Sequence, residues 1–97
     1  MAKEVYKGEM ESLLKDGAFL VDVRETDEVT ELSGLPGGTN VPLSRFAELA
    51  ARISNVRPTI FYCRSGLRSF QAAEIAASWT EQPVYYLFGG LVGLAEA

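Results

Sequence analysis

Short apolar segments alternate with amphipathic segments along the chain, and the breaks between them are rich in glycine and proline. The apolar runs are Ala18 to Val23, Thr59 to Cys63 and Val84 to Leu87, and they contain many β-branched and aromatic residues. Such runs, bounded by turn residues, predict buried strands. A strand that is apolar on both faces is typical of a parallel sheet.

The segments between these runs carry apolar residues at helical spacing. Met10, Leu13 and Leu14 predict a short helix that ends at Asp16-Gly17, and Thr26 is expected to cap a second short, acid-led helix. A third helix is predicted from a Ser44 cap to Asn55, with apolar positions at Phe46, Leu49, Ala50 and Ile53. A fourth is predicted from Ser69 to Trp79, with one face formed by Ala72, Ile75, Ala76 and Trp79.

This alternation of strands and helices predicts an α/β fold with a small, mainly parallel sheet. The chain has 97 residues, of which 47% are hydrophobic and 23% charged. This length and composition suit one domain spanning residues 1–97, without a repeat or linker.

The composition excludes several classes of chemistry. Histidine is absent, which removes Ser-His-Asp triads, Cys-His pairs and nearly every catalytic zinc site. Cys63 is the single cysteine, so an internal disulfide, a dithiol pair and a thiolate metal site are excluded as well. A lone thiol suits a reducing compartment.

The charge balance also limits the partners. A net charge of −4 and a pI near 4.7 argue against nucleic acid or an anionic membrane as a general partner. The amino-terminal residues lack the apolar core of a signal peptide, and no stretch has the length of a membrane span. We therefore expect a cytoplasmic protein.

The segment from Cys63 to Ser69, with the sequence Cys-Arg-Ser-Gly-Leu-Arg-Ser, follows a predicted strand and enters a predicted helix. In parallel sheets, ligands bind beyond the carboxyl ends of the strands, which is where this segment lies. A turn of this kind can direct backbone N–H groups inward to form an anion cradle. Gly66 gives the turn its conformational freedom. A thiolate in the cradle would be stabilised by these N–H groups and by Arg64 and Arg68, which would lower the pKa of Cys63.

A structural interpretation stands beside this one. A lone cysteine after an apolar strand is often a small buried hydrophobe, and Ser65 and Ser69 could cap the helix as readily as contact a ligand. The arginines favour the functional interpretation, because cations at a helix amino terminus oppose its dipole unless an anion is bound there.

The chain resembles single-domain rhodaneses, the thiosulfate and persulfide sulfurtransferases. The matching segments follow the family's order: Leu20 to Glu25, Leu35 to Leu43, Cys63 to Ser69, and Phe88-Gly89-Gly90. The resemblance implies the rhodanese-like fold, with helices on both faces of the sheet. It also implies a sulfurtransferase in which Cys63 carries sulfane sulfur as a persulfide.

The roles of other residues follow from the same resemblance. Substrate binding is expected from the loop residues Arg64, Ser65, Gly66, Leu67 and Arg68. Asp22 and Arg24 match the family's Asp-Val-Arg, and we expect Arg24 to pair with a carboxylate and support the site from behind. The donor would be thiosulfate or a persulfide, and the acceptor cyanide or a thiol such as glutathione or thioredoxin. No metal or organic cofactor is implied.

Two alternatives remain beside the sulfurtransferase. One is a non-catalytic or partner-dependent sulfur-delivery or binding module that docks through the surface around the loop. The other is a cysteine phosphatase, which the loop disfavours because four residues separate Cys63 from Arg68, whereas related phosphatases have five. The chain also departs from the family pattern at Gly34, where histidine is frequent, and at Leu91, where an aromatic residue is usual.

Overall fold

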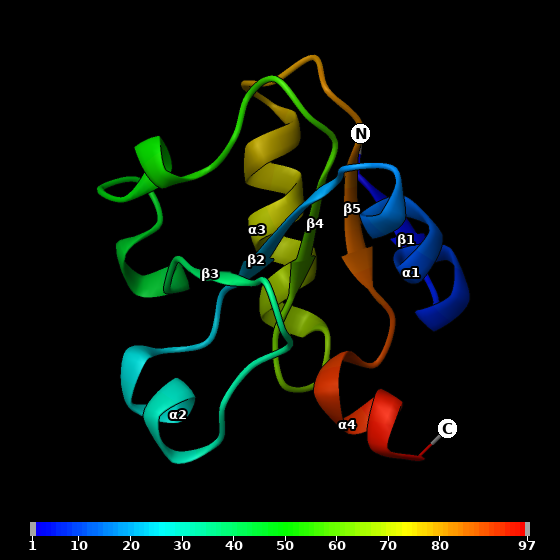
Figure 1. The fold of residues 1–97 in the computed structure, drawn as a ribbon. Helices are drawn as coiled ribbons and strands as arrows, with labels where there is room; N and C mark the ends of the chain where they lie inside the picture. Colours follow the sequence, from blue (N-terminus) through cyan, green and yellow to red (C-terminus); the bar gives the residue numbers. More distant parts are fainter. Residues whose placement is uncertain (1, 97) are drawn as a thin grey trace.

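The computed structural model describes residues 2–96 and contains one five-stranded sheet with helices around it (Figure 1). The strands are β1 (Lys3–Val5), β2 (Phe19–Asp22), β3 (Thr39–Asn40), β4 (Thr59–Tyr62) and β5 (Val84–Leu87). The α-helices are α1 (Lys7–Lys15), α2 (Thr26–Glu31), α3 (Leu67–Ala77) and α4 (Gly90–Glu96). The predicted α/β fold with a parallel sheet is confirmed.

The sheet has the order β1-β5-β4-β2-β3, and every pair of neighbouring strands is parallel. The carboxyl ends of all strands therefore lie at one edge. From β4, the chain continues to β5 on one side, whereas β2 and β3 lie on the other. This change of direction places the segment after β4 where α/β sheets form their binding sites.

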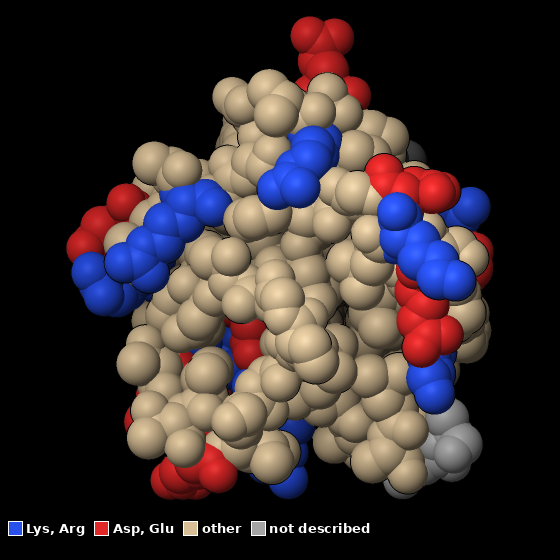
Figure 2. All heavy atoms as spheres, viewed as in Figure 1, with Lys and Arg blue, Asp and Glu red and all other residues tan. Residues whose placement is uncertain are grey.

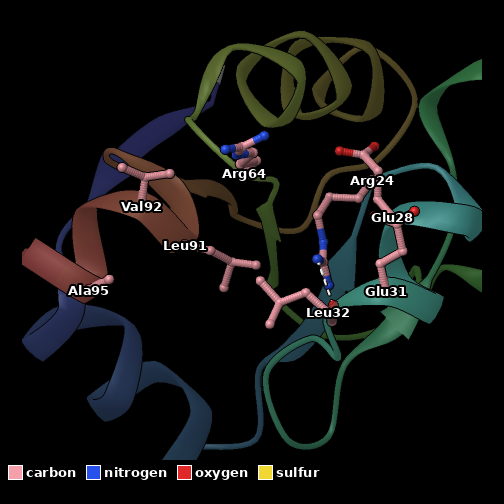
Figure 3. A pocket seen from close by; sticks show the side chains of 8 residues that line it. All are labelled: Arg24, Glu28, Glu31, Leu32, Arg64, Leu91, Val92 and Ala95. Atoms are coloured by element: carbon pink, nitrogen blue, oxygen red, sulfur yellow. Dashed lines mark hydrogen bonds between the residues drawn. The ribbon is translucent and has the colours of Figure 1, made fainter.

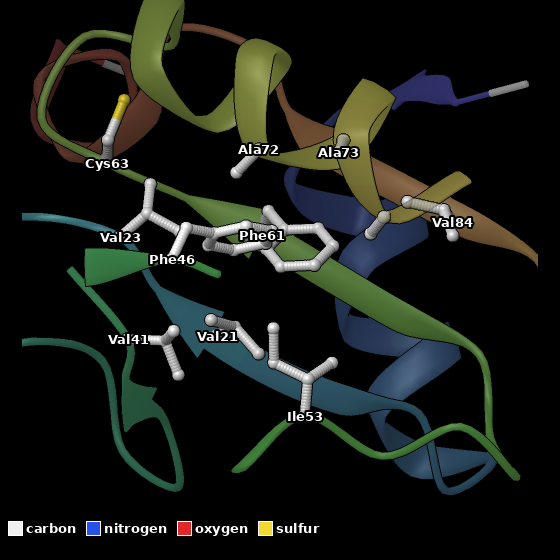
Figure 4. Close-up of a cluster of buried hydrophobic side chains, with 11 residues drawn as sticks. Val21, Val23, Val41, Phe46, Ile53, Phe61, Cys63, Ala72, Ala73 and Val84 are labelled. Carbon is white, nitrogen blue, oxygen red and sulfur yellow. The ribbon is translucent and has the colours of Figure 1, made fainter. Parts of the chain in front are cut away.

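Each face of the sheet has its own hydrophobic core. On one face Val21 and Phe61 pack beneath the small residues Ala72, Ala73 and Ala76 of α3 (Figure 4). On the other face the alternate strand residues pack with side chains of α1 and α4, in a cluster that includes Leu20, Ile60, Met10, Leu91 and Leu94. The predicted coverage of both faces is therefore confirmed.

The helix predicted from Ser44 to Asn55 is wrong. The segment instead forms two short 3₁₀ turns, η1 (Leu43–Arg45) and η2 (Ala50–Arg52). Phe46 and Ile53 are still buried in the core beneath α3, at 5% and 7% exposure. The apolar spacing identified buried side chains correctly, but two tight turns can bury them as well as a helix can. Ser44 caps neither turn, because its hydroxyl donates to the Glu25 carboxylate.

The predicted boundaries differ at two other helices. The residue that precedes α2 is Glu25, so Thr26 is the first helical residue and not its cap. Helix α3 begins at Leu67, two residues earlier than predicted, and Gly66 occupies its cap position. Ile75 and Trp79, predicted on the buried face of this helix, are 46% and 44% exposed. Within the described part of the chain, no helix is both long and apolar enough to cross a bilayer.

Candidate active site

The loop that follows β4 joins the centre of the sheet to the amino terminus of α3. Cys63 is the first residue after the strand, and Gly66 ends the loop with a φ of +107°. This left-handed conformation favours glycine, because a Cβ atom there is strained. The loop is only Cys63 to Gly66, so the sulfur atom lies close under the first turn of α3.

Cys63 is fully buried and its sulfur is surrounded by hydrogen-bonding groups. The backbone N–H groups of Gly66 and Ser69 donate to Sγ at 3.0 and 3.4 Å. The thiol donates to Ser69 Oγ at 3.5 Å, and that hydroxyl donates to the Gly66 carbonyl at 3.0 Å. Ser69 therefore does not cap the helix; it is fully buried and contacts the sulfur.

These contacts lower the pKa of the Cys63 thiol below its ordinary value. Burial acts in the opposite direction and is the largest single influence, because it disfavours the charged thiolate. The hydrogen bond between Cys63 and the Ser69 side chain and those from the backbone of Ser69, Gly66 and Ser65 together outweigh it. A lowered pKa raises the share of thiolate, which is the form in which a cysteine can act as a nucleophile, and the groups that lower it here do not include a histidine.

Helix α4 holds the outer side of the same loop. The N–H groups of Leu91 and Val92 donate to the carbonyls of Cys63 and Arg64 at 3.0 and 2.9 Å. Gly90 makes this approach possible, since a Cβ atom at that position would lie 2.5 Å from the Cys63 carbonyl oxygen. The double glycine of the sequence therefore permits close backbone packing against the loop.

The two loop arginines have different surroundings. Arg68 is half-buried and forms two hydrogen bonds with the Glu28 carboxylate of α2, at 2.5 and 3.0 Å. Arg64 is exposed, and among the described residues it has no ion-pair partner. The bond from Arg68, with a second from the Glu25 N–H, lowers the pKa of Glu28 to about 2. The sequence identifies Glu28 only as an acidic residue near a helix start, and no spacing in it indicates the pairing with Arg68.

Asp22 and Arg24 form a second arginine–carboxylate pair behind the loop. Arg24 Nη2 lies 2.7 Å from Asp22 Oδ2, and Arg24 Nε contacts both carboxylate oxygens at 3.1 Å. Both residues are 2% exposed. Arg24 Nη1 also donates to the Leu32 carbonyl at 2.8 Å. The expected pairing of Arg24 with a carboxylate is present. The additional hydrogen bond to Leu32 links the end of β2 to the end of α2.

Gly34, a departure from the family pattern, lies against this buried pair. A Cβ atom at position 34 would collide with the Tyr62 hydroxyl and lie 2.6 Å from Asp22 Oδ2. The Tyr62 hydroxyl accepts a hydrogen bond from the Leu35 N–H at 2.8 Å, and burial raises its pKa to about 12. Tyrosine at position 62 thus fills the space that a side chain at position 34 would need.

A pocket of about 350 Å³ borders the loop at Arg64 (Figure 3). It lies between α2 on one side and α4 on the other, at the carboxyl edge of the sheet. Its lining is Arg24, Glu28, Glu31, Leu32, Arg64, Leu91, Val92 and Ala95. Leu91, the other departure from the family pattern, therefore forms part of this wall. Within the described residues, no group of three or more His, Cys, Asp or Glu side chains is arranged to hold a metal ion.

The family model for the rhodanese-like domain matches residues 6–97. The chain belongs to the rhodanese-like domain family. The loop, the buried Asp22–Arg24 pair and the double glycine thus all lie within the matched region of a rhodanese-like domain.

Relatives of known sequence and structure agree with this assignment. A mouse protein named thiosulfate sulfurtransferase/rhodanese-like domain-containing protein 3 is 30% identical, over 91% of this chain and 65% of its own length. An Arabidopsis protein named rhodanese-like/PpiC domain-containing protein 12, chloroplastic, is 31% identical over 92% of this chain. The chain spans only 32% of that Arabidopsis protein. The solved structure of the human single-domain sulfurtransferase TSTD1 has a TM-score of 0.80 and 27% identity, and the match covers 99% and 97% of the two chains.

Proposed function

We propose that this rhodanese-like domain is a sulfurtransferase that moves sulfane sulfur through a persulfide on Cys63. The donor is thiosulfate or an organic persulfide, and the acceptor is cyanide or a thiol such as glutathione or thioredoxin. The observation that carries the proposal is the environment of the Cys63 sulfur, on which N–H groups of the loop and of α3 converge. The lone cysteine suits a reducing compartment such as the cytoplasm.

The reaction has two steps. The Cys63 thiolate attacks the outer sulfur of the donor, a new S–S bond forms at Cys63, and the donor's own bond to that sulfur breaks. Thiosulfate leaves as sulfite, whereas an organic persulfide leaves as a thiolate. In the second step the acceptor attacks the outer sulfur of the Cys63 persulfide, which restores the Cys63 thiolate; cyanide leaves as thiocyanate.

The loop groups have distinct roles in this cycle. The N–H groups of residues 64–68 stabilise negative charge on the transferred sulfur, as an oxyanion hole does for oxygen. Arg64 is exposed at the pocket and attracts an anionic donor, and Arg68 adds a second positive charge whose effect is reduced by Glu28. Asp22 and Arg24 hold the end of β2 in place, and β2 is the neighbour of β4, the strand that leads into the loop.

Intact mass spectrometry tests the proposal directly. Thiosulfate and 2-mercaptoethanol persulfide are each added to the protein, followed by cyanide, with Cys63→Ser as the matched variant. The expected result is a gain of one sulfur atom from at least one donor, absent in Cys63→Ser and removed by cyanide with release of thiocyanate. Equal thermal stability of the two proteins shows that the variant is folded.

The opposite result would favour the binding or delivery module. If neither donor loads the native protein, although Cys63 reacts with a small alkylating reagent, the domain does not accept sulfur from small donors. Release of phosphate from an aryl phosphate would instead revive the phosphatase alternative.

A further inference from the structure

The pocket beside Arg64 carries charge of both signs. Its charged lining residues are Arg24, Glu28, Glu31 and Arg64 (Figure 3). Two of these side chains already have partners, because Arg24 pairs with Asp22 and Glu28 pairs with Arg68. A ligand therefore gains little binding free energy from Arg24 or Glu28, because each of these charges already has a partner at short distance.

Arg64 and Glu31 are the remaining charged residues of the lining. Neither has an ion-pair partner within 4.0 Å among the residues that the structure describes. Figure 3 shows Arg64 on the loop and Glu31 on α2, with the pocket between them. The pocket thus presents one unpaired cation and one unpaired anion from different walls.

The rest of the lining is apolar. Leu91, Val92 and Ala95 come from α4, and Leu32 follows α2. Leu32 and Val92 are 65% and 40% exposed, so their apolar surface is available to a ligand. A volume of about 350 Å³ lies within the range of small organic-ligand sites.

The charges around the pocket do not favour a small dianion. The four charged side chains of its lining sum to zero, and the face shown in Figure 2 has acidic and basic groups interspersed. Such a surface steers a dianion only weakly, since steering depends on a field of one sign. Thiosulfate would also meet the unpaired Glu31 carboxylate in the same pocket.

We propose that this pocket selects a small zwitterionic organic persulfide as the sulfur donor, in preference to inorganic thiosulfate. The donor's carboxylate pairs with Arg64, its ammonium group with Glu31, and its carbon skeleton contacts Leu91 and Val92. This inference rests on the proposed function and names the donor of that reaction. Cys63 does not itself line the pocket, but Arg64, the next residue of the same loop, does. The step remains balanced: Cys63–S⁻ and R–S–SH give Cys63–S–SH and R–S⁻, with one S–S bond formed and one broken.

Four small persulfides that differ in charge provide the test. Cysteine persulfide carries both an ammonium and a carboxylate, cysteamine persulfide the ammonium alone, and 3-mercaptopropionate persulfide the carboxylate alone. 2-Mercaptoethanol persulfide carries neither, and thiosulfate is the fifth donor. The measured quantity is kcat/KM for thiocyanate release with cyanide as the acceptor, at neutral pH.

Two charge-removing variants separate the proposed contacts, with a third as a control. Glu31→Gln should lower kcat/KM about three- to tenfold for the two ammonium-bearing donors and leave 3-mercaptopropionate persulfide unchanged. Arg64→Gln should do the same for the two carboxylate-bearing persulfides and leave cysteamine persulfide unchanged. Glu81→Gln, an exposed change just before β5 at the opposite edge of the sheet, should alter none of the four.

Native protein should use cysteine persulfide at least about tenfold better than thiosulfate, because two charge-assisted contacts favour it. The inference is overturned if thiosulfate is the better donor, or if the donor ranking is the same in all three variants. Loading of Cys63 by 2-mercaptoethanol persulfide keeps these failures separate from failure of the proposed function. If no donor loads Cys63, both are wrong.

Discussion

Two arginine–carboxylate pairs lie beside the Cys63 loop, and they differ in burial. In the Asp22–Arg24 pair both side chains are 3% exposed, and Arg24 also holds the Leu32 carbonyl. In the Glu28–Arg68 pair the side chains are 32% and 30% exposed, and Glu28 lines the pocket beside Arg64. The same two chemical groups therefore lie beside the loop in two different environments, one buried and one half-exposed.

The difference shows what burial does to a charge pair. A buried pair contributes little net stability compared with apolar residues, but loss of one partner leaves an uncompensated charge in the interior. A half-exposed pair is screened by water and contributes less, yet its charges can still act on a ligand. We therefore assign the Asp22–Arg24 pair to the support of the loop and the Glu28–Arg68 pair to the adjustment of its charge.

The largest effect is expected for Arg24→Ala, which leaves Asp22 buried without its partner. The free energy of unfolding should fall by about 3–5 kcal/mol, a large part of what a small domain possesses. Urea unfolding measures this value, with Arg45→Ala as the control, because Arg45 pairs with Glu48 at 53% and 62% exposure. The control should lose much less, because water screens an exposed pair. A loss for Arg24→Ala no larger than that of the control, with full activity retained, would refute its supporting role.

A smaller effect, on activity, is expected for Glu28→Gln. This change removes the carboxylate that holds Arg68, so Arg68 presents its full charge to an anionic donor. We expect kcat/KM for thiosulfate to rise about three- to tenfold and to become more sensitive to salt. The amide oxygen can still accept from the Glu25 N–H, which preserves the start of α2. No change, or a decrease with unaltered stability, would mean that Glu28 does not moderate Arg68.

The smallest effect is on stability in acid. The folded-state pKa of Glu28 is about 2, below the ordinary value near 4.5, so the ionised group favours folding. This contribution is complete above about pH 4.5 and is lost as the pH falls through about 2. The difference in unfolding free energy between native protein and Glu28→Gln should therefore shrink between pH 5 and pH 2.5. A difference that stays constant over this range would contradict the lowered pKa.

The fold was predictable where burial imposes a strong pattern. Strands β2, β4 and β5 each lie in one of the apolar runs of the sequence, in which Asp22 is the one charged residue. The edge strands β1 and β3 were not predicted, because they are short and only Val5 among their residues is buried. The apolar spacing around Phe46 predicts a helix that the chain does not form, because periodicity reports burial and not backbone geometry.

The candidate site was predictable in position but not in its contacts. The Cys63 loop lies where the end of a parallel strand places it, and Gly66 has the positive φ that its position required. The Glu28–Arg68 pair joins residues 40 positions apart, and local spacing contains no signal for such a contact. The same holds for Gly34, which lies between α2 and β3 and whose need for glycine comes from Tyr62 of β4.

The contact between α4 and the loop has an electronic consequence. The Val92 N–H donates to the Arg64 carbonyl, and that carbonyl shares its peptide unit with the Ser65 N–H, one of the groups that lower the pKa of Cys63. A peptide unit that accepts at its oxygen is polarised, so its N–H becomes a stronger donor. The backbone of a helix outside the loop thus acts, through a single shared amide, on the acidity of the thiol.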